Sequence, residues 1–237
     1  MIVDADGQVN YQALFLGMPK AGKSTLMRAV ARRALVEDRA IVVVHDPEGE
    51  WSRKWPGCVT VETSRHARVM LENLRAPPKG WRATHAPGPL PMLGRVIACR
   101  LEASEVAAFV MTLGKMVNTA ERVTVPILVL FDEGAYLDDS SSTHQGDGDK
   151  KLTAVRRHRG IAVGWNVQSP ATLPVPFWRL ATDVYIVSAL PSYEDARAAE
   201  KHCGLDRGAL EFARRLERYQ IVRIHRGRGI VPLWSQQ

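Results

Sequence analysis

The sequence has little cysteine and no long apolar run. Its three cysteines, Cys58, Cys99 and Cys203, are far apart and form no CxxC pair. Scattered thiols of this kind are typical of small buried side chains in a reducing compartment. No apolar stretch approaches the roughly 20 residues of a membrane-spanning helix, and the first residues lack the basic-then-apolar pattern of a secretory signal. We therefore expect a cytoplasmic protein without a transmembrane segment.

Internal repeats and low-complexity tracts are also absent from the 237 residues. Hydrophobic residues make up 46% and charged residues 24%, which is ordinary for a globular protein. The length suits one large α/β domain and is short for two separate enzyme cores, so we predict a single domain over residues 1–237. The net charge of +7 favours a polyanionic partner, most simply nucleic acid, although an arginine excess can also reflect genome base composition.

Apolar runs alternate with stretches of helical periodicity along most of the chain. This pattern predicts an α/β fold, a mostly parallel sheet with helices on both faces. Proline and glycine break the pattern at about 76–94, where we expect an extended excursion, and Ser, Asp and Gly predict a mobile loop at about 138–149. Strands are expected at 13–16, 40–44, 59–61, 95–101, 127–131, 161–166, 184–187, 220–224 and 229–233, and helices at 24–37, 65–74, 103–119, 151–158, 193–202 and 208–218.

Residues 17–24, GMPKAGKS, match the phosphate-binding pattern GxxxxGK[ST] in full. The match lies between a predicted buried strand and a predicted helix, which is where such a loop binds phosphate. Its glycines let backbone N–H groups surround a β-phosphate, Lys23 would reach the β- and γ-phosphates, and the Ser24 hydroxyl would bind Mg²⁺. The predicted nucleotide-binding residues are Gly17, Met18, Pro19, Lys20, Ala21, Gly22, Lys23, Ser24 and Thr25.

Two adjacent carboxylates follow the most apolar strand, 127–131. Asp132 stands at its carboxyl end, where it can bind Mg²⁺ through water, and Glu133 can orient and deprotonate the attacking water. A kinase needs no such base, because its acceptor supplies the nucleophile. The pair therefore favours hydrolysis of ATP, with Mg²⁺ as cofactor, over phosphate transfer to a metabolite.

A polar group ends the strand that comes next in sequence, 161–166. Gln168, in the run Asn166–Pro170, can sense the γ-phosphate from a strand beside the Mg²⁺-binding one. The alternative is a glutamine whose side chain only satisfies loop backbone. Both interpretations stay open at the level of sequence.

These elements in this order resemble the HerA/FtsK superfamily of nucleic-acid-pumping ATPases. The resemblance runs from about Ala13 to Leu190. Besides the phosphate-binding loop, it includes VVVHDPEGEW at 42–51, similar to the superfamily's second strand and its turn, and RRHRGI at 156–161 leading to Gln168-Ser169-Pro170, similar to its arginine-rich helix and sensor. The resemblance implies a RecA-like fold of the additional-strand, catalytic-glutamate type.

The resemblance also implies partners. It predicts a ring of this chain, usually of six subunits, in which an arginine reaches the neighbouring active site; Arg156, Arg157 and Arg159 are the candidates, and an exposed basic helix face is the alternative. The chain has no room for the N-terminal barrel of cellular HerA or for the membrane segments and winged helix of FtsK. Its size is instead similar to the compact genome-packaging ATPases of membrane-containing viruses, which implies double-stranded DNA and a capsid vertex or membrane protein as partners.

Several other residues are candidates with a structural alternative. For contact with nucleic acid, solvated faces or ring interfaces are equally good interpretations. Asp46 and Glu48 either position the phosphate-binding loop or a neighbouring subunit, or only end a strand, and Trp51 and Trp55 are expected to pack around that strand's turn. The nucleic-acid candidates are Lys79, Trp81, Arg82, His85, Arg214, Arg215, Arg218, Arg223, Arg226 and Arg228.

We therefore expect an ATPase that translocates nucleic acid, in particular a viral packaging motor acting in the host cytoplasm or at the capsid vertex. One alternative is a secretion, conjugation or phage-extrusion (Zot-like) ATPase acting at a membrane. The other is a nucleotide-dependent switch with slow turnover, against which the predicted base Glu133 argues.

Overall fold

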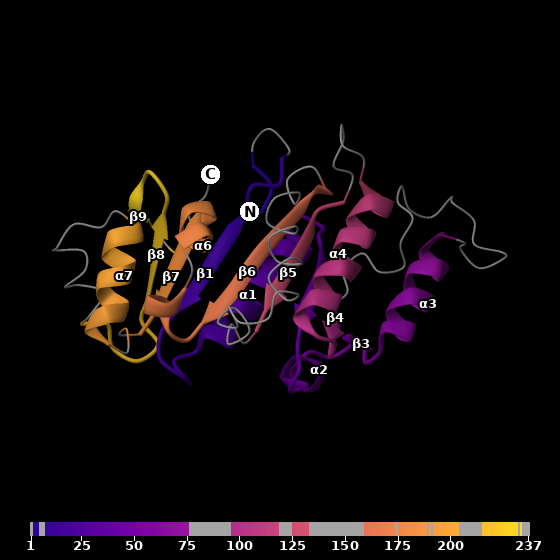
Figure 1. Ribbon diagram of the computed structural model, residues 1–237, viewed down its shortest axis with the longest axis horizontal. Coiled ribbons are helices and arrows are strands. Elements are labelled where there is room, and N and C mark those ends of the chain that lie inside the picture. The colour runs from indigo at the N-terminus through magenta and orange to yellow at the C-terminus, as the bar shows by residue number, and fades with distance from the viewer. Residues whose placement is uncertain are drawn as a thin grey trace. The chain divides into compact units, whose positions relative to one another are not determined.

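The computed structural model describes residues 2–4, 8–75, 96–118, 125–132, 159–173, 175–188, 190, 192–203, 215–231 and 233. Nine strands in this part of the chain form a mixed, mostly parallel sheet with flanking helices (Figure 1). The strands are β1 (Gln12–Leu16), β2 (Ile41–His45), β3 (Val59–Val61), β4 (Val96–Cys99), β5 (Ile127–Phe131), β6 (Ile161–Val167), β7 (Asp183–Val187), β8 (Ile221–His225) and β9 (Gly229–Val231). The helices are α1 (Lys23–Val36), α2 (Glu50–Lys54), α3 (Ser64–Arg75), α4 (Ala103–Val117), η4 (Pro170–Thr172), α6 (Val175–Leu180) and α7 (Tyr193–Cys203).

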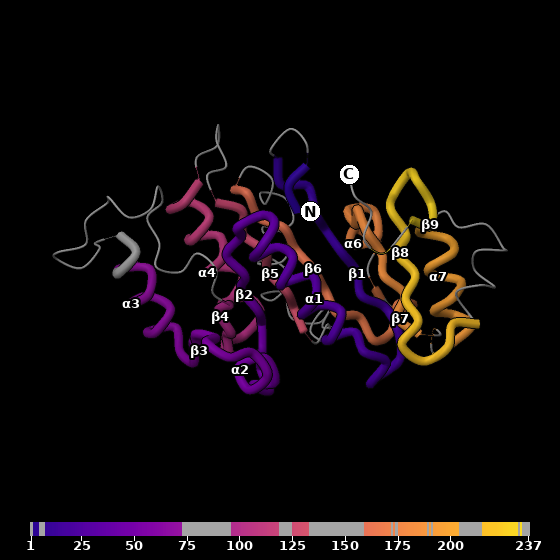
Figure 2. Tube along the Cα trace, turned by 180° about the vertical axis from the view of Figure 1, so that it is seen from behind, coloured from indigo at the N-terminus to yellow at the C-terminus, as the bar shows by residue number. Residues whose placement is uncertain are grey.

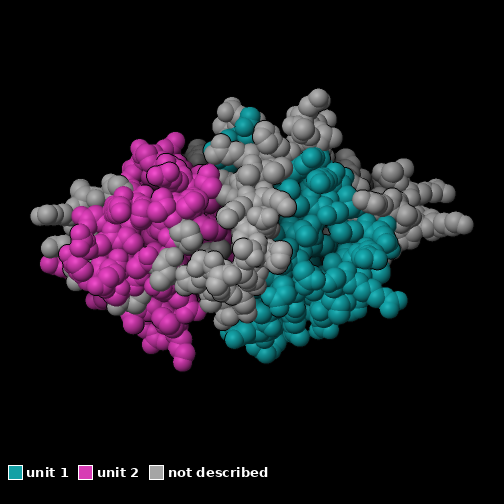
Figure 3. Space-filling model, viewed as in Figure 1, with its two compact units in different colours: residues 1–10, 31–130, 141–162 teal, residues 11–30, 131–140, 163–237 magenta. Residues whose placement is uncertain are grey.

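The chain divides into two compact units that alternate along the sequence (Figure 3). Unit 1 contains residues 1–10, 31–130 and 141–162, and unit 2 contains residues 11–30, 131–140 and 163–237. Strands β5 and β6 and helix α1 each have residues in both units. The prediction of one domain over residues 1–237 stays a prediction.

Unit 1 is built on parallel strands in the order β3-β4-β2. All five residues of β2 are buried, as expected for a parallel strand covered on both faces. Helices α3 and α4 lie on one face and the second half of α1 lies on the other, as the opposite views of Figures 1 and 2 show. Helix α4 begins with a capping box, in which Glu102 and Glu105 each accept a backbone N–H of the first turn.

Unit 2 places β1 between its parallel neighbours β6 and β7. The sheet then continues through the antiparallel strands β8 and β9. Helices α6 and α7 cover one face, and the start of α1 covers the other (Figures 1 and 2). Because β1 is completely buried, the loop that follows it starts from a fixed point at the carboxyl edge of the sheet.

The predicted fold class is confirmed, and the strands and most of the helices lie where the sequence placed them. Three short elements were missed: α2, η4 and α6. The predicted helix at 208–218 is wrong at its end, because residues 215–218 are not helical. The predictions for 76–94, 138–149 and 151–158 lie outside the described residues.

Candidate nucleotide-binding site

The phosphate-binding loop begins at Gly17, directly after β1. Gly17 has φ +144°, a conformation that residues with a side chain rarely adopt. A Cβ atom there would also overlap the carbonyl oxygen of Val187, at the end of β7. The loop can therefore leave the sheet edge only because residue 17 is a glycine.

The rest of the loop turns back into helix α1. Lys20 and Gly22 have φ values of +60° and +103°, so residues with left-handed backbone alternate with ordinary ones, as in the backbone concavities that bind anions. The N–H of Ala21 donates to the carbonyl of Met18 at 3.2 Å and closes the turn. The N–H of Leu26 donates to the Gly22 carbonyl at 3.0 Å and starts the helix. The first N–H groups of a helix are a typical binding site for phosphate.

The Lys23 ammonium lies against the loop itself. Its Nζ donates to the carbonyl oxygens of Gly17 at 2.7 Å and Met18 at 2.9 Å, and the residue is only 5% exposed. Burial lowers the pKa of this ammonium to about 8, and the negative charge of Asp132 opposes that shift. Lys23 is thus held at the loop by two carbonyl oxygens, and its burial favours the neutral amine.

Ser24 and Asp132 meet beside the loop. The Ser24 hydroxyl donates to Asp132 Oδ1 at 3.0 Å, and the Asn166 side-chain amide donates to the same oxygen at 2.8 Å. Asp132 is 8% exposed and Asn166 is 6% exposed. The Asn166 Oδ1 atom is buried and has no hydrogen-bond partner among the described residues. A hydroxyl and a carboxylate this close are the oxygen ligands that Mg²⁺ takes beside nucleotide phosphates, so the residues fit this ion.

Solved structures with this fold are known. The chain is similar to the genome packaging NTPase B204 of Sulfolobus turreted icosahedral virus 2, in complex with ATP-γS, with a TM-score of 0.64 and 15% identity, covering 95% of this chain and 98% of that chain. It is similar to VirB4 of Thermoanaerobacter pseudethanolicus, with a TM-score of 0.60 and 11% identity over 99% of this chain and 96% of that one. It is also similar to the bacterial conjugative coupling protein TrwB, with a TM-score of 0.54 and 12% identity, covering 95% of this chain and 85% of that chain.

The chain therefore has the α/β, RecA-like P-loop NTPase fold of these three proteins. No protein-family model matches the sequence, and no curated protein matches it significantly, so this assignment rests on structure. The packaging NTPase was solved with the ATP analogue ATP-γS bound. No helix in the described part of the chain is long and apolar enough to cross a membrane.

The predicted sensor Gln168 follows β6 directly and is exposed. The loop around it is attached to α7. Asp195 Oδ1 accepts the N–H of Ala171 at 2.8 Å and the Ser169 hydroxyl at 3.4 Å, while Asp195 Oδ2 accepts the Ser192 hydroxyl at 2.8 Å. Asp195 therefore ties the first turn of α7 to the loop that follows Gln168.

Asn166 is the site residue that sequence reasoning missed. It lies inside β6, two residues before Gln168. A polar residue next to the end of the buried run IAVGWNV was the available signal. The contact with Asp132 shows why an amide occurs there.

Three of the predicted catalytic residues, Glu133, Arg156 and Arg157, lie outside the described residues. Arg159 is described and belongs to unit 1, where its carbonyl accepts the side-chain amide of Asn118 at 2.8 Å. Their roles stay predictions.

Asp46 and the pair Trp51 and Trp55 lie together around the turn after β2. Asp46 Oδ2 accepts the N–H groups of Trp51 and Ser52, both at 3.1 Å, so Asp46 holds the start of α2. Trp51 is fully buried and stacks on Trp55 with ring centroids 6.0 Å apart, which confirms their packing role.

Basic candidates for nucleic-acid contact fall into different environments. Arg223 is buried and its Nε pairs with Asp183 at 2.7 Å, so it is not available to a phosphate backbone. Arg215, Arg218, Arg226 and Arg228 are exposed. The candidates Lys79, Trp81, Arg82, His85 and Arg214 lie outside the described residues.

Proposed function

We propose that this chain hydrolyses ATP and uses the energy to translocate nucleic acid, and that its substrate is double-stranded DNA being packaged into a virus particle. One observation carries the proposal. A complete phosphate-binding loop, with Ser24 hydrogen-bonded to Asp132 at 3.0 Å, lies in a fold that matches the viral packaging NTPase over 95% of this chain and 98% of that one. The similarity extends over 95% of this chain and 98% of the packaging NTPase, which supports a related function.

Different residues of the site would bind the phosphates and the metal ion. Lys23 would exchange its bonds to the Gly17 and Met18 carbonyls for the β- and γ-phosphates of ATP. Ser24 and Asp132 would hold Mg²⁺, which neutralises charge on the phosphate oxygens when it is bound. Asn166 keeps the Asp132 carboxylate in place by donating to Oδ1.

Hydrolysis needs a water and a base. Glu133 follows Asp132, one of the two predicted metal ligands, directly in the sequence. There it would orient the attacking water and accept its proton. Gln168, on the loop that Asp195 holds, would respond to the presence of the γ-phosphate, and Arg156, Arg157 or Arg159 would complete the site of a neighbouring subunit in a ring.

Contact with nucleic acid is supported by charge. The chain carries +7, and exposed arginines include Arg226 and Arg228 in the turn between β8 and β9. A motor that moves along DNA of any sequence needs phosphate contacts and no base-reading element. Binding should therefore weaken steeply with salt and show little preference among sequences.

The proposal is tested by the steady-state ATPase rate of the purified chain with and without double-stranded DNA, on material whose oligomeric state is measured by light scattering. We expect turnover that depends on Mg²⁺ and increases with DNA of random sequence. Turnover that DNA leaves unchanged would argue for the slow nucleotide-dependent switch.

A second candidate function is a conjugation, secretion or Zot-like extrusion ATPase that a partner recruits to a membrane. The similarity to VirB4 over 99% of this chain and to the coupling protein TrwB over 95% favours it. Stimulation of the ATPase by liposomes or a membrane partner, without stimulation by double-stranded DNA, would select this candidate over packaging.

A further inference from the structure

Tyr219 lies directly against the phosphate-binding loop. A Cβ atom built on Gly22 would be 3.3 Å from the Cδ1 atom and 3.7 Å from the Cε1 atom of this ring. One edge of the tyrosine ring therefore occupies the space next to the last glycine of the loop, where a side chain at residue 22 would meet it. The residue is nevertheless 61% exposed, so most of the ring is open to solvent beside the site of the phosphates.

The backbone of Tyr219 is held in an uncommon conformation. Its φ is +70°, and Ser188, at the end of β7, has φ +62°. Two hydrogen bonds connect these segments. The N–H of Tyr219 donates to Ser188 Oγ at 3.0 Å, and the N–H of Ser188 donates to the Gln220 carbonyl at 2.8 Å. Left-handed backbone at residues with side chains costs free energy and is found where surrounding contacts enforce it, often at functional sites.

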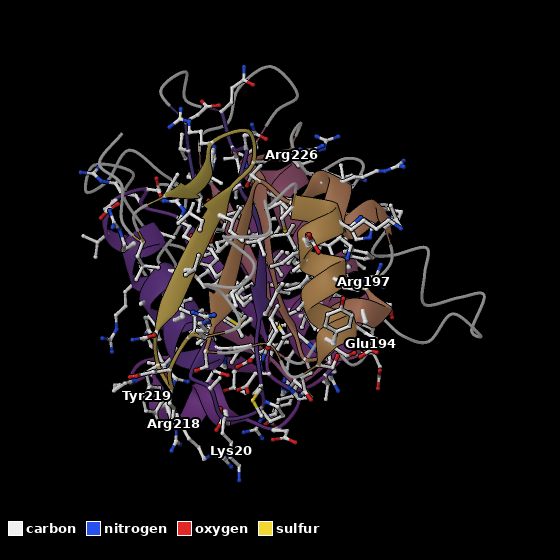
Figure 4. The ribbon with its side chains drawn as sticks, turned by 90° about the vertical axis from the view of Figure 1, so that its left-hand side faces the viewer. Lys20, Glu194, Arg197, Arg218, Tyr219 and Arg226 are labelled. Carbon is white, nitrogen blue, oxygen red and sulfur yellow. The ribbon has the colours of Figure 1, made fainter. Side chains whose placement is uncertain are left out.

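A positive charge accompanies the ring. The guanidinium carbon of Arg218 lies 4.9 Å from the ring centroid of Tyr219, at cation–π distance. Figure 4 shows Arg218 and Tyr219 together with Lys20 of the phosphate-binding loop at one end of unit 2, whereas Arg226 is at the other end. The phosphate-binding end of this unit thus presents an exposed aromatic surface with basic groups around it.

We propose that Tyr219 stacks on the base of the bound nucleotide. The inference rests on the proposed nucleotide function and adds a binding residue to it. When the β-phosphate fills the loop, the ribose and base must lie outside it, and the ring beside Gly22 is a flat apolar surface at the rim of that loop. Every base has a π-face, so a stacking contact of this kind accepts ATP and GTP alike.

Tripolyphosphate separates this role from simple support of the loop, since it fills the phosphate site and has no base. The variant is Tyr219→Asn, because asparagine tolerates left-handed backbone and removes the ring. We expect it to weaken ATP and GTP binding roughly 5- to 150-fold, the range of one base–aromatic stack, and to leave tripolyphosphate binding unchanged. The control Tyr219→Phe keeps the ring and should bind all three ligands like the wild type.

Equal loss of ATP and tripolyphosphate binding in Tyr219→Asn would overturn the inference, because the ring would then only support the loop. Unchanged ATP binding in Tyr219→Asn, or a loss in Tyr219→Phe, would also overturn it. The proposed function fails in a different way: the wild-type chain would bind neither ATP nor tripolyphosphate.

Discussion

The Ser24 hydroxyl and the Asp132 carboxylate are hydrogen-bonded at 3.0 Å although 108 residues separate them in sequence. The first residue belongs to the start of α1 and the second follows the end of β5. This contact joins the phosphate-binding loop to the acidic residue that follows β5. It is the structural reason for assigning Mg²⁺–ATP to this end of unit 2.

Asn166→Ala should raise the Mg²⁺ concentration needed for half-maximal ATPase activity. The substitution removes the amide that donates to Asp132 Oδ1 at 2.8 Å, and loss of such a supporting contact costs about 10- to 100-fold in metal affinity. A Mg²⁺ titration of the ATPase rate measures the effect. The matched control is Asn10→Ala, at an exposed asparagine, and identical Mg²⁺ dependence of the two variants would contradict the role of Asn166.

ATP affinity should fall as the pH rises above about 8. The pKa of Lys23 in the free protein is lowered to about 8, chiefly by burial, and the negative phosphates of ATP would raise it. Below pH 8 the lysine is protonated with and without ATP, so affinity is fully present. Above that pH the free protein loses the proton and binding must restore it, which costs up to about tenfold in affinity per pH unit until the pKa of the complex is reached.

Calorimetric titration between pH 7 and 9.5 in buffers of different ionisation enthalpy would measure both the affinity and the proton uptake. Lys23→Arg is the control, because its charge persists throughout this range and its affinity should show no such fall. A wild-type affinity that is equal at pH 7.5 and 9.5 would show that Lys23 does not pair with the phosphates.

Gly17→Ala should destabilise the fold by about 2–5 kcal/mol. Left-handed backbone with a Cβ costs about 1–2 kcal/mol, and the overlap with the Val187 carbonyl adds about 1–3 kcal/mol. Gly227→Ala is the matched control, since its φ is +78° and nothing lies within 4 Å of a Cβ there. Urea unfolding that gives the same loss for both variants would disprove the close approach at Gly17.

The sequence predicts those parts of the site whose residues are close together in the chain or stand at recognisable strand ends. The loop at 17–24 was predictable because strand, glycine-rich turn and helix are contiguous, and its meeting with Asp132 followed because parallel strands end at one edge of the sheet. Asn166 was missed because it lies inside an otherwise apolar strand. Tyr219 was missed because only the folded chain brings the turn before β8 against Gly22, and no local pattern marks that contact.

The same reasoning explains two smaller differences. Asp46, in the run that resembles the superfamily's second strand and turn, accepts the first N–H groups of the short helix α2, which periodicity cannot reveal in five residues. Arg223 is one of several C-terminal arginines in the sequence. Its pairing with Asp183 depends on the antiparallel register of β7 and β8.

A ring with an arginine acting on the neighbouring subunit predicts complementation. One of Arg156, Arg157 and Arg159 is expected to act on the neighbouring site. Replacing that arginine by alanine should abolish turnover, and so should Glu133→Gln. Mixed rings should recover part of the rate, because some interfaces pair an intact glutamate with an intact arginine. The measurement is the ATPase rate across mixing ratios, with subunit exchange verified by light scattering. Full turnover after replacement of all three arginines would show that none of them acts on the neighbouring subunit's site.

The central claim is that this chain hydrolyses ATP through the loop at Lys23 and the base Glu133, in the service of DNA movement. The most direct test measures ATP binding and ATP hydrolysis for the wild type, Lys23→Ala and Glu133→Gln, each with and without double-stranded DNA. We expect DNA-stimulated turnover by the wild type, loss of nucleotide binding in Lys23→Ala, and binding without hydrolysis in Glu133→Gln, with a rate about 10²–10⁴-fold lower. Near wild-type turnover by Glu133→Gln, or a wild-type chain that binds ATP and does not hydrolyse it, would contradict the account.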